Sequence, residues 1–145
     1  MTKLYDQDFL AWTRDQADAL RRRSANELDW ENLLEEVESL GKQQRSELRS
    51  HLIILLVHLL KWRLQPERRG RSWELTIAEQ RKEAQRVLRQ NPSLQPELST
   101  VMAEAYETAV LRAERETRLA ASAFPEMMPF DVQEVLMGDL SRDGG

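Results

Sequence analysis

One nearly all-apolar segment constrains the fold of this chain more than any other feature. The chain is apolar at almost every position from Leu52 to Leu60, then carries Lys61 and Trp62, and the segment stops at Pro66. A helix that is apolar on nearly every side is buried among other helices or in an oligomer interface. Proline does not continue a helix, and the residue before it disfavours helical geometry. The sequence therefore predicts a buried central helix that ends beside polar and aromatic groups.

The composition is that of a helical protein without thiol chemistry. The 145 residues include five glycines, five prolines and no cysteine. Few glycines and prolines favour long helices, and the lack of cysteine excludes disulfides and thiolate metal sites. We expect one domain over residues 1–145, with a loose tail from about residue 141. The longest apolar run is six residues, too short for a membrane span, and the polar segment Met1–Asp8 lacks the apolar centre of a signal peptide. We expect a cytoplasmic protein that does not bind membranes.

Hydrophobic periodicity predicts four main helices and one short helix. Apolar residues recur at the helical spacing in each segment, and turn residues separate the segments. The expected fold is all-α: an antiparallel bundle of four main helices with a short C-terminal helix, since short loops make consecutive helices pack antiparallel. The expected helices span Asp8–Arg23, Asp29–Leu64, Ser72–Arg89, Leu94–Ala121 and Val132–Met137. Asp29, Ser72 and Asp131 are the expected N-caps.

The second of these helices is expected to be continuous. Its apolar stripe runs from Trp30 to Trp62 and passes Gly41 without a change of phase. An unbroken helix of this length would extend roughly 50 Å at 1.5 Å per residue. The residues expected at a dimer interface, unless other helices of the chain cover them, are Ile53, Leu56 and Leu60.

Several polar residues lie on helix faces that are otherwise apolar, among them Gln44, His51, Gln80 and Glu116. A buried carboxylate needs a partner, because an unpaired charge in the core is strongly unfavourable. We expect Glu116 to contact at least one of the available partners, which are His58, Lys61, Arg71, Arg81 and Gln80. Such a cluster is either a structural network that fixes the helix register or a ligand or catalytic site.

In the second interpretation the candidate catalytic residues are Glu116, His58 and Lys61. Glu116 or His58 would act as the general base, and Lys61 or Arg71 would hold an anion. The candidate ligand-binding residues are Arg71, Gln80, Arg81, Trp62 and Trp73.

No metal site and no cofactor are expected. Helical metal bundles carry Glu-x-x-His on two helices, and the chain has neither this pattern nor His-x-x-x-His. His51 and His58 are seven residues apart, roughly 10 Å along a helix, which is too far to share one ion.

One basic cluster is interleaved with aromatic residues, a pattern that can bind phosphate or single-stranded nucleic acid. Its members are Lys61, Trp62, Arg63, Arg68, Arg69, Arg71, Trp73 and Arg81. The net charge of −4 makes a nucleic-acid partner an unfavoured interpretation.

A set of short motifs occurs in a fixed order along the chain. They are Tyr5-Asp6-x-Asp8-Phe9-x-x-Trp12, Leu28-Asp29-x-x-Asn32-Leu33-x-Glu35-Glu36-x-Glu38-x-x-Gly41, His58-Leu59-Leu60-Lys61-Trp62 with Gln65-Pro66, Ser72-Trp73-x-x-Thr76-Ile77-x-x-Gln80-Arg81, Pro92-Ser93-Leu94, Tyr106-x-x-Ala109, Glu116-Thr117 and Phe124-Pro125. Together they resemble the domain of unknown function 29 family, small all-helical bacterial proteins common in cyanobacteria. The resemblance implies an all-helical bacterial cytoplasmic protein, and it carries over no activity and no catalytic residue. The chain departs from it at Arg118, where we expect a small residue.

Three functions remain open. The first is a non-enzymatic module that binds another protein or itself, and closed salt bridges with a large apolar surface would favour it. The second is a small-ligand-binding protein or enzyme, which an enclosed pocket lined by Glu116, His58, Lys61, Arg71 and Gln80 would favour. The third is nucleic-acid binding, which a continuous exposed stripe joining Arg63, Arg68, Arg69, Arg71 and Arg81 would favour.

Overall fold

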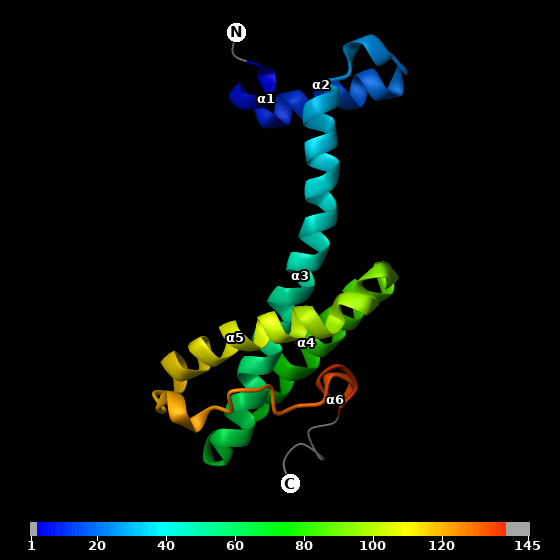
Figure 1. The fold of residues 1–145 in the computed structure, drawn as a ribbon. Coiled ribbons are helices and arrows are strands. Elements are labelled where there is room, and N and C mark those ends of the chain that lie inside the picture. Colours follow the sequence, from blue (N-terminus) through cyan, green and yellow to red (C-terminus); the bar gives the residue numbers. More distant parts are fainter. Residues whose placement is uncertain (1–2, 139–145) are drawn as a thin grey trace. The chain divides into compact units, whose positions relative to one another are not determined.

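The computed structural model describes residues 3–138, and all regular secondary structure in this range is helical (Figure 1). The all-α prediction is therefore confirmed. Contacts divide the chain into two compact units, Met1–Gln43 (unit 1) and Gln44–Gly145 (unit 2), which are described one at a time. The prediction of a single domain stays a prediction, and the predicted loose tail lies outside the described residues.

Four long helices and a short C-terminal helix occur as predicted, with one extra short helix near the start of the described range. The helices are α1 Leu4–Gln7, α2 Phe9–Arg21, α3 Trp30–Leu64, α4 Arg71–Gln90, α5 Leu98–Thr117 and α6 Val132–Met137. Four 3-10 turns join them: η1 Ala25–Glu27, η2 Pro66–Arg68, η3 Pro92–Glu97 and η4 Ala121–Ala123.

In unit 1, α2 lies across the start of α3 (Figure 1). The carboxylate of Asp8 caps α2 by accepting a bond from the backbone N–H of Ala11 at 2.9 Å. Asp29 precedes α3 as predicted and accepts a 2.7 Å bond from the side-chain amide of Asn32. Gln16 of α2 accepts a 2.7 Å bond from the backbone N–H of Asp29, which fixes α2 against the helix start.

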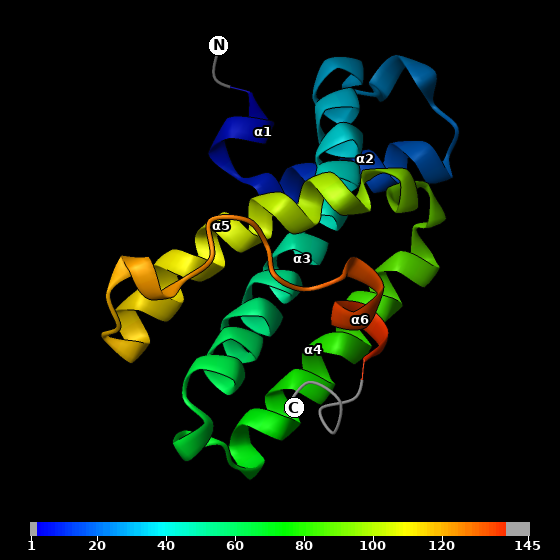
Figure 2. The same ribbon diagram turned by 60° about the horizontal axis from the view of Figure 1, so that its bottom comes forward.

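Unit 2 contains the hydrophobic core. Its part of α3 runs antiparallel to α4, and α5 crosses α3 (Figure 2). After α5, the chain returns to α4, where α6 packs. The largest fully buried side chains are Leu48, Leu52, Leu55, Leu56, Leu60, Ile77, Met102, Val87, Val101 and Val135. The predicted central helix is thus confirmed for the second part of α3.

The long helix α3 is continuous through Gly41. The predicted stripe, however, is buried only in unit 2. In unit 1, Trp30, Leu34, Val37 and Leu40 are each at least 60% exposed, because the other described helices of that unit leave this face uncovered. Even α3 is not long and apolar enough to cross a membrane, nor is any other helix within residues 3–138.

Several helix boundaries differ from the prediction. The fourth main helix ends at Thr117 rather than Ala121, because Arg118 adopts a left-handed conformation with φ of 62° that terminates α5. This helix also begins later, at Leu98, because the proline-containing segment Pro92–Glu97 forms a 3-10 helix. The predicted cap Ser72 is wrong, since α4 begins at Arg71 and Gly70 occupies the N-cap position.

Candidate functional site

The predicted contact of Glu116 is confirmed. Its Oε2 lies 2.6 Å from Nζ of Lys61, so the last turn of α3 and the last turn of α5 meet in an ion pair. The Lys61 side chain is 14% exposed, but that of Glu116 is 48% exposed. The expectation of a buried carboxylate was therefore wrong: α5 ends one residue later, and its last turn is open to solvent. Ion pairs this exposed contribute at most about 1 kcal/mol.

His58 lies close enough to this pair for both charges to act on its pKa. The ring is half-buried, and Nδ1 lies 2.8 Å from the carbonyl oxygen of Ile54. The pKa of His58 is lowered, and burial of the ring is the largest cause of this shift. The charge of Lys61 also lowers this pKa, whereas the charge of Glu116 raises it. The three predicted catalytic residues thus come together beside the end of α3.

Both predicted tryptophans contact cations. Nζ of Lys61 lies 5.7 Å from the ring centroid of Trp73. The guanidinium carbon of Arg69 lies 5.0 Å from the ring centroid of Trp62. Arg69 also donates a 2.7 Å bond from Nε to the carbonyl of Trp62. The indole N–H of Trp62 is buried and has no hydrogen-bond partner within residues 3–138.

The other predicted ligand-binding residues face elsewhere. Gln80 is buried and binds His51, not Glu116. Arg71 is exposed and pairs with Glu74 of its own helix at 3.1 Å. Arg81 is buried and binds backbone carbonyls of α6. The predicted site residues therefore do not line one enclosed pocket, and the exposed arginine stripe that would favour nucleic-acid binding does not extend to Arg81, which is buried.

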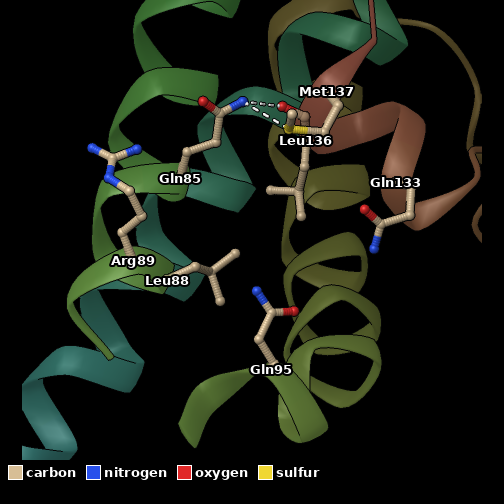
Figure 3. Close-up of a pocket in the computed structure, with 7 residues that line it drawn as sticks. All are labelled: Gln85, Leu88, Arg89, Gln95, Gln133, Leu136 and Met137. Carbon is tan, nitrogen blue, oxygen red and sulfur yellow. Dashed lines mark hydrogen bonds between the residues drawn. The ribbon is translucent and has the colours of Figure 1, made fainter. Parts of the chain in front are cut away.

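A shallow pocket of about 270 Å³ lies between α4, η3 and α6 (Figure 3). It is lined by Gln85, Leu88, Arg89, Gln95, Gln133, Leu136 and Met137. Gln85 closes one side by donating a 2.6 Å bond to the carbonyl of Leu136. The sequence carries no signal for this pocket, because glutamines spread over three segments look like ordinary surface residues. Its lining offers no carboxylate or imidazole for acid–base chemistry.

One described group of side chains has the composition of a metal site. Glu47 and His51 of α3 and Glu83 of α4 each offer a ligand atom, and these atoms lie within 4.8 Å of one another. The group was not predicted, because its residues form neither Glu-x-x-His nor His-x-x-x-His. The spacing Glu47-x-x-x-His51 also places two side chains on one helix face and was the available signal. The third member comes from another helix and has no local signal.

In unit 1, polar contacts join residues from the motifs on which the family resemblance rests. The hydroxyl of Tyr5 donates to the carboxylate of Glu36, and this bond is the main reason that the pKa of Tyr5 is raised to about 12. The indole N–H of Trp12 donates to Asp29 at 3.0 Å. The pKa of Asp29 is lowered from its ordinary value. Hydrogen bonds from Asn32 are the largest cause, and the bond from Trp12 contributes less. These motifs therefore hold α1, α2 and α3 together.

The comparisons with known proteins agree with the resemblance. A family model described as "Domain of unknown function DUF29" matches residues 4–140. Searches of curated proteins and of solved structures found no match. The matched range covers nearly the whole chain and includes both units. The chain belongs to the DUF29 family of domains of unknown function.

Proposed function

We propose that this protein is a non-enzymatic interaction module that self-associates through an apolar surface of unit 1. That surface, the α3 stripe, consists of Trp30, Leu34, Val37 and Leu40, whose exposed fractions are 60–64%. This exposure is the observation that carries the proposal. Contiguous apolar patches on a protein surface mark interaction sites when they are large and polar residues border them. Here Glu31, Glu35 and Glu38 border the stripe.

The small core of unit 1 supports the same proposal. Its buried side chains, among the described residues, are Trp12, Gln16 and Ala19. Segments of about 40 residues rarely bury enough surface to be stable without oligomerisation, metals or disulfides. A helix placed on the α3 stripe would supply the buried apolar area that unit 1 lacks.

A second copy of the chain fits the stripe because the spacing is self-complementary. The spacing is four, three and four residues along Trp30, Leu34, Val37 and Gly41. This order of intervals is the same in both chain directions. In an antiparallel pair about a two-fold axis, Trp30 of one copy lies opposite Gly41 of the other, and Leu34 lies opposite Val37. A Cβ placed at Gly41 would meet nothing within 4 Å, so the space beside it is open to an indole ring.

Sedimentation velocity of the full chain tests the proposal. We expect the wild type to form a dimer at micromolar concentration and Leu34→Glu to be monomeric with an unchanged far-UV circular dichroism spectrum. The matched control is Leu111→Glu on α5, because Leu111 is 64% exposed but lies in unit 2. A monomeric wild type, or equal disruption by both variants, would overturn the proposal.

Gly41→Leu separates pairing from helix stability. The new side chain enters open space in a single chain and replaces a residue that disfavours helix by about 1 kcal/mol. We therefore expect a more stable helix but a weaker dimer, since the leucine fills the space that receives Trp30. An undiminished dimer would exclude the Trp30–Gly41 pairing.

A small-ligand or enzymatic role around Glu116, His58 and Lys61 is the second proposal. Its support is that these three groups lie near one another. Lys61 and Glu116 neutralise each other, however, and Arg71 and Gln80 have other partners. Closed ion pairs together with an exposed apolar surface are the arrangement expected of an interaction module.

A further inference from the structure

A group of potential metal ligands lies between α3 and α4 of unit 2, apart from the sites above. Glu47 and His51 occupy successive turns of α3, and Glu83 faces them from α4. One ligand atom from each residue lies within 4.8 Å of the other two, and all three residues are half-buried. An imidazole nitrogen and two carboxylates form a donor set that suits first-row divalent metals.

Gln80 sets the orientation of the imidazole. Its side-chain oxygen lies 2.7 Å from Nδ1 of His51, and Gln80 itself is buried. A carbonyl oxygen only accepts, so Nδ1 is the donor in this contact, and in the neutral ring Nε2 then presents its lone pair. Nε2 is the atom that faces the group, 3.6 Å from Oε1 of Glu47. Metal-binding histidines are usually held in this way, by an acceptor on the ring nitrogen that does not bind the metal.

Arg86 already places a cation between the two carboxylates. Its Nη2 lies 2.5 Å from Oε1 of Glu47, and its Nε lies 2.9 Å from Oε2 of Glu83. The arginine side chain is one-third exposed, and its Nη1 is also bonded to Gln90 at 3.1 Å. The guanidinium can therefore leave the carboxylates while keeping one acceptor, and a divalent ion would bring greater charge to the same place.

We propose that Glu47, His51 and Glu83 bind one divalent metal ion of the Zn²⁺ class, with Arg86 displaced toward Gln90. Three protein ligands with the fourth position left to water match the coordination of open zinc sites. The imidazole favours Zn²⁺ over Mg²⁺ and Ca²⁺, which prefer all-oxygen sites. This proposal departs from the sequence expectation of no metal and is independent of the dimer, because its ligands lie in unit 2.

Titration of the untagged full chain with Co²⁺, followed by Zn²⁺ displacement, tests the site. We expect one ion per chain and the visible absorption bands of protein-bound Co²⁺. His51→Ala should abolish these bands, and Glu83→Gln should weaken binding. Gln80→Leu should lower the affinity by about 10–100-fold through loss of the ring's orientation. Arg86→Gln should raise it by roughly tenfold, because two charge-assisted hydrogen bonds no longer compete with the ion.

The chain provides its own control for these titrations. It has two histidines and no cysteine, so His58→Ala removes the only other imidazole and should leave Co²⁺ binding unchanged. Far-UV circular dichroism of each variant establishes that it is folded. Stoichiometric binding that persists in folded His51→Ala would overturn the proposal. So would the absence of binding in both the wild type and Arg86→Gln, since the latter has no competing guanidinium.

Discussion

At the scale of single residues, His58 links folding to pH. Its ring is half-buried, and burial lowers its pKa, while the bond to Ile54 and the charge of Glu116 only partly oppose this shift. The unfolded chain, with an ordinary histidine pKa of about 6.5, therefore binds more protons than the folded chain as the solution becomes acidic. Neutral His58 is the form that the fold accommodates.

We predict that the contribution of His58 to stability is complete above about pH 6.5 and declines as the pH falls below that value. His58→Gln should remove this part of the pH dependence, because glutamine does not titrate. Urea unfolding of both proteins between about pH 5 and pH 8 measures the difference. Equal pH dependence in the wild type and the variant would contradict the prediction.

Glu116 and Gln80 show how much of a site can be predicted from helical period. Both occupy otherwise apolar faces, which indicated that each would have a partner, and each has one. Gln80 is buried because α3 packs beside it, whereas Glu116 is half-exposed because α5 ends just beyond it. The helical spacing of apolar residues identifies which face of a helix points inward, but it does not show where along that face the covering helix ends.

At the scale of elements, α6 depends on side chains of α4. Its six residues are too few for an independent helix, and the carbonyls in the last turn of a helix generally need partners from outside the helix. Arg81 donates from Nε to the carbonyl of Val135 at 2.8 Å and from Nη2 to that of Glu134 at 3.2 Å. Gln85 bonds the carbonyl of Leu136. The predicted ligand-binding arginine thus holds α6 in place.

Arg81→Met should lower the free energy of unfolding by about 1.5–3 kcal/mol, because buried carbonyls lose hydrogen bonds from a charged donor. Lys82→Met is the matched control, since the neighbouring lysine is exposed and should change stability by no more than about 0.5 kcal/mol. Urea unfolding at neutral pH measures both values. Equal losses in the two variants would show that Arg81 does not anchor α6.

The end of α5 shows why an element boundary escaped prediction. Left-handed residues that terminate helices are usually glycine or asparagine, and Arg118 is neither. The alanines that follow favour helix, so no local signal marked the stop at Thr117. The chain departs from the family resemblance at this position, where a small residue is expected, and glycine, the smallest, would adopt the left-handed conformation more readily than arginine.

At the scale of the whole molecule, sequence periodicity predicted the helices better than the core. The number of long helices, their order and the continuity of α3 were all accessible from apolar spacing. The same spacing runs through Trp30 and Leu55, although one is 64% exposed and the other fully buried. Burial depends on which helices lie against each stretch, and this information is not local to the stretch.

The uneven cover of α3 has a consequence for the exchange of its backbone amides with deuterated water. Amides of residues 52–60 lie in the core of unit 2 and should open only when that unit unfolds. Amides of residues 31–41 carry the same helical bonds but little packing, so they should exchange much sooner. If two copies pair along this part of the helix, its exchange should slow as protein concentration rises, while that of residues 52–60 stays the same. A single helix would then report both the folding of one unit and the assembly of two chains.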